Sequence, residues 1–248
     1  MYTAFASVYD RLMADVPYRE WADYYGRLLS LYGAGQGAVV ECACGTGSLT
    51  AELAKQFPRI TGVDLSGDML AVAMEKARNR GLSIPFIRQD MRKLTLPRRV
   101  NAVLCTCDGV NYLTKEADAL AFFRAAREAL RPGGALVFDV SAPYKLEKEL
   151  GTCTRALTDE DIAYIWQSAY DEDTALFDIR MDIFVRDEAG TYRRIVEEQT
   201  QRAHTREELT GWLVKSGFEE IRFFGDRTLE EPGEKELRWH IAAKRNED

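Results

Sequence analysis

Short, uniformly apolar runs alternate with helical patterns between residues 38 and 141, and this alternation restricts the fold more than any other feature. Strands of a parallel sheet are covered by helices on both faces, so they lack the polar positions of half-exposed strands. The runs are Ala38–Cys42, Ile60–Leu65, Ile84–Arg88, Asn101–Cys107 and Ala135–Val140. The helical segments are Tyr18–Tyr32, Ser48–Phe57, Gly67–Arg80 and Ala117–Leu130. The pattern predicts an α/β fold with a parallel sheet between helical layers.

Apolar and polar residues alternate in the next part of the chain, which is typical of strands with one exposed face. The alternating runs are Ile162–Tyr170, Leu176–Arg186 and Tyr192–Arg202. Thr205 and Glu208 form the sequence pattern of a capping box, which predicts a helix that ends at Ser216. Two further strands are predicted at Phe218–Gly225 and Leu237–Ala243.

These elements predict a Rossmann-like three-layer sandwich with a seven-stranded, mostly parallel sheet. We expect residues 1–150 and 204–248 to form this α/β domain. Residues 151–203 are expected as an inserted antiparallel β subdomain that acts as a lid.

The composition is that of a globular protein. Of the 248 residues, 46% are hydrophobic, which excludes a disordered chain. The net charge of −7 argues against a broad basic face for nucleic acid. No run reaches the roughly 18 uncharged apolar residues of a membrane span, and the N-terminus lacks a secretory signal pattern. The five cysteines are consistent with free thiols in a reducing compartment, so we expect a cytoplasmic location.

A glycine-rich turn, Glu41–Gly47, follows the first strand, and an acidic residue, Asp64, ends the second. Asp90 follows the third strand. Because parallel strands end at one edge of a sheet, these loops are expected to meet in one crevice, where such sheets bind ligands.

The turn differs from that of a dinucleotide site. Ala43 stands where the first glycine is expected, and Glu41 precedes the turn. A carboxylate repels a pyrophosphate but attracts a cation. The residues therefore favour a ligand with a ribose, an adenine and a positive charge over NAD.

The order and spacing of these motifs resemble those of the class I S-adenosylmethionine-dependent methyltransferases. The resemblance covers about residues 1–245. Its carriers are Glu41–Gly47, Gly62–Leu70, Gln89–Arg92, Cys107–Leu113 and Leu130–Gly134. It implies S-adenosylmethionine as the cofactor and S-adenosylhomocysteine as its product.

The resemblance also implies which residues bind the methionine part of the cofactor. These are Glu41 and the backbone around Gly45 and Gly47, with Cys107 nearby. Ala43 belongs to the same turn, and glycine is usual at its position.

For the adenosine part, the resemblance implies that Asp64 binds the ribose hydroxyls. Leu65 and Met69 are implied to pack on the adenine. Asp90 is implied to bind the adenine amino group, with Met91 beside it.

The N-terminal segment 2–10 resembles the opening of small bacterial methyltransferases, in whose relatives tyrosines close over the cofactor. This resemblance implies cofactor contacts for Tyr9, Tyr18 and Trp21. Packing of these aromatic rings on the core is the alternative interpretation. The segment 162–203 resembles the lid that such enzymes place over the substrate.

The implied reaction is a direct displacement, with Tyr9 orienting the reacting groups and Asp108 or His204 as the base. A turn or capping role is the alternative for both candidate bases. The cysteine pairs, Cys42 with Cys44 and Cys105 with Cys107, lack the usual spacing of a zinc site, so no metal is expected.

The acceptor is expected to be a small molecule, since no appended binding module is recognisable. Methylation of RNA or of a ribosomal protein is an alternative, as is a protein that binds the cofactor without transferring methyl. The RNA alternative depends on a basic cluster after the third strand: Arg88, Arg92, Lys93, Arg98 and Arg99. The sequence does not identify the acceptor atom or the oligomeric state.

Overall fold

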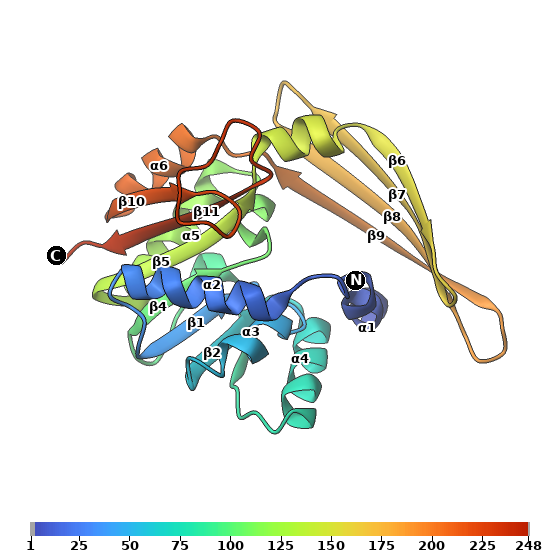
Figure 1. Cartoon of the computed structure of the whole chain (residues 1–248), viewed down its shortest axis with the longest axis horizontal. Helices are drawn as coiled ribbons and strands as arrows, with labels where there is room; N and C mark the ends of the chain where they lie inside the picture. The colour runs from blue at the N-terminus through green and yellow to red at the C-terminus, as the bar shows by residue number, and fades with distance from the viewer. Residues whose placement is uncertain (1–2, 248) are drawn as a thin grey trace.

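A seven-stranded sheet forms the centre of the molecule, in the strand order β10-β11-β5-β4-β1-β2-β3. The structure is a computed structural model that describes residues 3–247 (Figure 1). Tyr2, the first residue of the N-terminal pattern, lies outside the described residues. Neighbouring strands are parallel from β5 to β3, and β11 is antiparallel to both β5 and β10. The strands are β1 (Ala38–Cys42), β2 (Arg59–Asp64), β3 (Phe86–Arg88), β4 (Val100–Cys105), β5 (Leu130–Ser141), β10 (Phe218–Phe224) and β11 (Arg238–Arg245).

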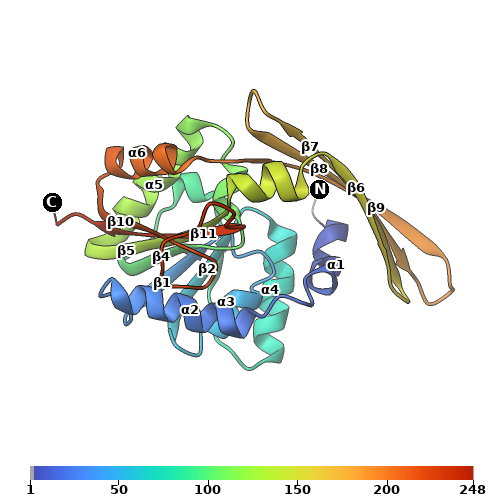
Figure 2. The same ribbon diagram turned by 45° about the horizontal axis from the view of Figure 1, so that its top comes forward.

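Helices cover both faces of this sheet and bury its apolar side chains (Figure 2). On one face lie α2 (Tyr18–Leu31), α3 (Ser48–Leu53) and α4 (Gly67–Asn79). On the other lie α5 (Glu116–Ala129) and α6 (Arg206–Lys215). Three short helical turns connect elements: η1 (Met91–Lys93), η2 (Gly109–Tyr112) and η3 (Lys145–Leu150).

A second sheet projects from the edge of this sandwich (Figures 1 and 2). We call it the lid sheet; its antiparallel strands are β6 (Cys153–Thr158), β7 (Ile162–Asp171), β8 (Leu176–Arg186) and β9 (Tyr192–Arg202). The N-terminal helix α1 (Thr3–Leu12) packs against it through a separate apolar cluster, which includes Phe5 of α1, Ile183 of the lid sheet and Met69 of α4. Helix α1 therefore lies between the lid sheet and the α/β body.

The structure confirms the predicted fold class, including the seven-stranded sheet, the antiparallel sheet and the capping box at Thr205. Several local expectations were wrong. The third strand begins at Phe86 rather than Ile84, next to Pro85, which has no N–H to donate to a sheet. The strand predicted from Ala135 begins at Leu130. Strand β6 was not predicted because its residues are mostly exposed and show no alternation.

Within residues 3–247, no helix combines the length and apolar character that a membrane crossing requires.

Candidate functional site

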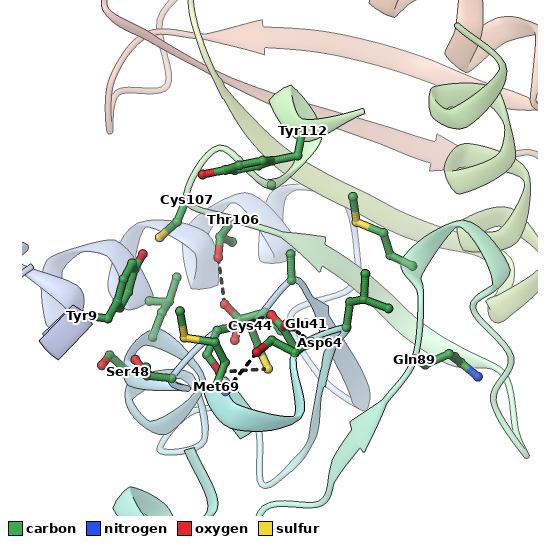
Figure 3. Close-up of a pocket in the computed structure, with 18 of the residues that line it drawn as sticks. Tyr9, Glu41, Cys44, Ser48, Asp64, Met69, Gln89, Thr106, Cys107 and Tyr112 are labelled. Carbon is green, nitrogen blue, oxygen red and sulfur yellow. Dashed lines mark hydrogen bonds between the residues drawn. The ribbon is translucent and has the colours of Figure 1, made fainter. Parts of the chain in front are cut away.

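A cavity of about 350 Å³ lies at the carboxyl ends of β1, β2 and β4, where the sequence predicts a crevice. Figure 3 shows its wall: Tyr9, Cys107 and Tyr112 lie along one part, and Asp64 and Met69 along another. Most of the predicted cofactor contacts line it: Tyr9, Tyr18, Glu41, Ala43, Gly45, Asp64, Leu65, Met69, Asp90, Met91 and Cys107. Gly47 and Trp21 do not line it.

The glycine-rich turn has a left-handed backbone at every second position, at Ala43, Gly45 and Gly47. Gly47 has a φ of 69°, and a Cβ there would lie 3.0 Å from the Cβ of Ala73, so the residue shapes the turn without facing the cavity. Ala43 has a φ of 52°, a conformation that costs a residue with a Cβ roughly 1–2 kcal/mol. This explains why glycine is usual at that position in the family that the sequence resembles.

Asp64 closes the turn through its carboxylate. It accepts hydrogen bonds from the backbone N–H groups of Gly45 and Ser66, both at 2.8 Å. Burial raises its pKa, and these hydrogen bonds oppose the shift. The carboxylate thus ties β2 to the turn that follows β1 while it faces the cavity.

Glu41 is the most deeply buried carboxylate that lines the cavity, with 1% of its surface exposed. Each of its oxygens accepts one hydroxyl hydrogen bond, from Thr50 at 2.5 Å and from Thr106 at 2.8 Å. Burial raises its pKa to about 7, against the effect of the two hydroxyls. A buried carboxylate with that pKa gains its charge readily when a cation arrives.

The opposite part of the cavity combines one acidic group with apolar surface. Asp90 caps η1 and pairs with Arg92, and this contact lowers the Asp90 pKa. Leu65 has 61% of its surface exposed, although it is apolar and lines the cavity. Met69 and Met91 complete an apolar surface that suits a flat ring.

Helix α1 is fastened to the glycine-rich turn next to Tyr9. Asp10 accepts a hydrogen bond from the Thr46 hydroxyl at 2.6 Å and forms an ion pair with Lys76 of α4 at 2.7 Å. This contact holds Tyr9 at the cavity wall. Burial raises the pKa of the Tyr9 hydroxyl, which therefore stays protonated at neutral pH.

A second cavity, of about 270 Å³, adjoins the first beneath the lid sheet. The two cavities have five lining residues in common: Phe5, Tyr9, Cys107, Tyr112 and Gln199. The Tyr112 hydroxyl donates to the Gln199 side-chain oxygen at 2.7 Å, so this shared wall also joins the lid sheet to the α/β body.

The backbone at the end of β4 is unusual on this shared wall. Cys107 and Asp108 have φ values of 54° and 64°. Their N–H groups both donate to the buried carboxylate of Asp139, at 2.8 and 3.1 Å. Arg238 pairs with both Asp139 and Asp108 and lies over the ring of Trp21, 4.9 Å from its centroid.

The candidate bases differ in their position. Asp108 lines the second cavity; burial opposes its ionisation, but Arg238 and Lys145 outweigh burial and lower its pKa to about 2. His204 was expected at the mouth of the lid, and this was wrong, because its side chain is fully buried and lines neither cavity. It contacts the Val110 carbonyl oxygen, and burial lowers its pKa to about 4.

Other residues singled out from the sequence have structural partners. Trp21 lines the second cavity while it packs against Tyr25 and His240. In the basic cluster, Arg92 is paired with Asp90 and Asp118. Within the described part of the chain, no three His, Cys, Asp or Glu side chains are grouped to hold a metal ion.

Sequence reasoning missed Asp139, Arg238 and the lid residues of the second cavity. Asp139 gave a usable signal, since it is the one charged residue in the predicted strand Ala135–Val140. The lid residues could have been found from their alternation, because side chains that face one way share one surface.

The first cavity fits the cofactor that the sequence resemblance implies. Glu41, Asp64 and Asp90 place three carboxylates in its wall, which suits a cationic ligand with hydroxyl groups and disfavours a pyrophosphate. The exposed Leu65 and the two methionines supply the apolar surface that an adenine requires.

Comparisons with known proteins agree with this geometry. A family model described as "Methyltransferase domain" matches residues 39–134. The chain is 34% identical to a protein of Geobacillus sp. (strain WCH70) described only as a methyltransferase, over 98% of this chain and 99% of that one. It is 31% identical to a dTDP-3-amino-3,6-dideoxy-alpha-D-glucopyranose N,N-dimethyltransferase of Streptomyces fradiae, over 49% of this chain and 46% of that one. The crystal structure of an S-adenosylmethionine-dependent methyltransferase from Clostridium acetobutylicum superimposes with a TM-score of 0.89 at 29% identity, over 99% of both chains.

Proposed function

Because this chain belongs to the class I S-adenosylmethionine-dependent methyltransferases, we propose that it methylates an oxygen or nitrogen atom of a small-molecule acceptor by direct transfer. Its cofactor is S-adenosylmethionine, and the product is S-adenosylhomocysteine. The acceptor occupies the second cavity. The observation that carries this proposal is the wall shared by the two cavities, because it brings an acceptor next to a ligand of the first.

Different residues of the first cavity bind different parts of the cofactor. Glu41 holds the cationic methionine part, and Asp64 accepts hydrogen bonds from the ribose hydroxyls. Leu65 and Met69 contact the adenine, and Asp90 accepts a hydrogen bond from its amino group. When bound, S-adenosylmethionine supplies a methyl group that is already activated by the sulfonium sulfur, so no nucleophilic side chain is required.

The protein positions the acceptor next to the methyl group and excludes water from the reacting atoms. Tyr9, Cys107 and Tyr112 separate the two cavities only in part, and they hold the attacking atom close to the methyl group. The Tyr9 hydroxyl stays protonated, and the ring offers an electron-rich face to a positive charge. A small acceptor is also consistent with the sugar methyltransferase of Streptomyces fradiae that resembles half of this chain.

The test has two steps. Calorimetry should show that S-adenosylmethionine and S-adenosylhomocysteine bind and that NAD does not. Protein with methyl-labelled S-adenosylmethionine is then incubated with an ultrafiltered metabolite extract, with RNA or with ribosomal protein. Label in the metabolite fraction supports the proposal. Label in RNA or protein alone contradicts it, and binding without any transfer identifies a protein that only binds the cofactor.

A further inference from the structure

The wall of the second cavity is mostly aromatic and aliphatic, and two elements contribute much of it. Helix α1 contributes Phe5, Tyr9 and Leu12. The lid sheet contributes Tyr164 and Trp166 from β7, and Ile179 and Met181 from β8. Trp166 and Met181 are cross-strand partners, so their side chains lie on one face of the lid sheet. Flat apolar surfaces on two elements suit a planar ring.

The cavity offers no uncompensated charge to a ligand. Among the described residues that line it, the charged side chains are Asp108 and Arg238, which pair with each other through two contacts. Behind them, Asp139 pairs with Arg238. Burial lowers the pKa of Lys145, and the neighbouring Asp108 raises it. The volume of about 270 Å³ lies just below the usual range for ligand pockets, which is about 300–1,000 Å³. These features fit one substituted ring and disfavour a nucleotide-linked sugar with its diphosphate.

Trp166, which lines this cavity, carries a hydrogen-bond donor. Its Nε1–H is buried and has no acceptor among the described residues. A buried donor without a partner is uncommon, and a ligand oxygen would satisfy it. An ammonium group would not, because it carries only donors.

The nucleophile must also lose a proton, and the cavity provides a weak base. Asp108 is the one carboxylate among the described residues of its wall, and the contact with Arg238 keeps its pKa low. A phenolic hydroxyl has a pKa near 10 in water and ionises far more readily than an aliphatic alcohol. It can therefore react without a strong protein base.

We propose that the acceptor is a single-ring hydroxylated aromatic compound whose ring lies between α1 and the lid sheet, with a second oxygen bound by the Trp166 N–H. This inference rests on the function proposed above. A lone pair of the phenolic oxygen forms the bond to the methyl carbon as the carbon–sulfur bond breaks, and its electron pair stays on sulfur. The phenolic proton passes to solvent. The products are an aryl methyl ether, S-adenosylhomocysteine and a proton.

The experiment measures transfer of labelled methyl to matched probes. 4-Hydroxybenzaldehyde carries a phenol and a second oxygen, and 4-methylphenol lacks the second oxygen. Benzyl alcohol, aniline and glucosamine represent an alcohol, an aromatic amine and an amino sugar. We expect transfer to both phenols, with a lower KM for 4-hydroxybenzaldehyde, and none to benzyl alcohol or glucosamine.

Trp166→Phe tests the proposed contact, since it keeps an aromatic ring and removes the N–H. It should raise the KM for 4-hydroxybenzaldehyde about two- to tenfold, as expected for one hydrogen bond, and leave the KM for 4-methylphenol unchanged. Trp239→Phe is the matched control, because Trp239 packs against Phe223 and does not line the second cavity. It should alter neither value.

The outcomes separate this inference from the proposed function. Transfer to aniline or glucosamine with both phenols inert would leave a small-molecule methyltransferase and overturn the phenol. If no probe is methylated, ligand-observed NMR with protein loaded with S-adenosylhomocysteine decides, and failure of both phenols to bind overturns the inference as well. Equal KM changes for both phenols in Trp166→Phe would remove Trp166 from the recognition of the second oxygen.

Discussion

Arg238 on β11 forms a buried ion pair with Asp139 on the neighbouring strand β5. The Asp139 carboxylate also accepts the Tyr25 hydroxyl at 2.6 Å and the backbone N–H groups of Cys107 and Asp108. One pair of charges thus fixes the left-handed backbone at the wall between the two cavities. Breaking such a pair leaves a buried charge without compensation.

Replacement of Arg238 by leucine should therefore reduce stability strongly. Asp139 and Asp108 lose their partner, and we expect the free energy of unfolding to fall by about 3–5 kcal/mol. Urea denaturation followed by circular dichroism measures the change. Arg59→Leu is the control, because Arg59 is exposed at the start of β2, and it should stay within about 0.5 kcal/mol of wild type. Equal stability of both variants would contradict a structural role for the pair.

The same contact predicts how stability depends on acid. The pKa of Asp108 is lowered from 3.8 in the unfolded chain to about 2 in the folded protein. The stability that this depression contributes is fully present above about pH 4 and is lost as the pH falls through about 2. In Asp108→Asn this contribution is absent, so the difference in unfolding free energy from wild type should shrink between these pH values. A constant difference across this interval would refute the assignment.

Cofactor affinity should rise with pH through neutrality because of Glu41. Its pKa is about 7, and the carboxylate form attracts a cation whereas the protonated form does not. We expect S-adenosylmethionine to bind more tightly at about pH 8 than at about pH 6, with proton release detectable by calorimetry in buffers of different ionisation enthalpy. Glu41→Gln should bind more weakly and lose most of this pH dependence. A wild-type affinity that does not vary with pH would show that Glu41 does not change its charge on binding.

A rise in pH has the opposite effect on folding stability at Glu41: it strengthens cofactor binding but destabilises the folded state. The folded pKa of Glu41 lies above its unfolded value of 4.5, so ionisation disfavours the folded state increasingly as the pH rises from about 4.5 to about 7. Glu41→Gln should therefore gain stability relative to wild type over that interval. Thermal melts across the interval measure the trend, and a relative loss with rising pH would contradict it.

Removal of the Asp64 carboxylate should weaken cofactor binding. Asp64→Ala is expected to cost about 1.5–3 kcal/mol of binding free energy, the range for hydrogen bonds to a charged group. Calorimetric titration with S-adenosylhomocysteine provides the measurement. Glu75→Ala, an exposed acidic residue on α4, controls for the change in net charge. An unchanged affinity in Asp64→Ala would exclude the ribose contact.

The contact that fastens α1 can be tested without knowing the acceptor. In Asp10→Ala, α1 loses the Thr46 hydrogen bond and the Lys76 ion pair. Hydrogen exchange in residues 3–12 should become faster, and cofactor affinity should fall, since Tyr9 is held less firmly. Asp15→Ala, at an exposed position after α1, should change neither. Unaltered exchange in Asp10→Ala would mean that apolar packing alone holds the helix.

The α/β body was predictable because its signals are local. Uniformly apolar strands and the turn after β1 identify the sheet and the edge where ligands bind. Asp64 and Asp90 follow from their positions at strand ends. Elements without such a signal were missed: β6 is an exposed edge strand, and α1 owes its place to contacts with the lid sheet and α4.

The functional assignment of His204 failed for a different reason. A histidine before a helix looks the same in the sequence whether it faces a cavity or the core. Its burial depends on contacts with Trp212 on the following helix and with Val110, which comes from a distant part of the chain. The pairing of Asp139 with Arg238, 99 residues apart, is equally invisible to local patterns.

The side chains shared by the two cavities have a thermodynamic consequence. Tyr9, Cys107, Tyr112 and Gln199 line both cavities, so an adjustment of these groups by a ligand in one cavity would change the surface presented to a ligand in the other. By linkage, the factor by which the cofactor alters acceptor affinity equals the factor by which the acceptor alters cofactor affinity. If the acceptor binds in the second cavity as proposed, the two binding steps are coupled energetically, and we expect a substitution in this wall to change the cooperativity between them as well as either affinity alone.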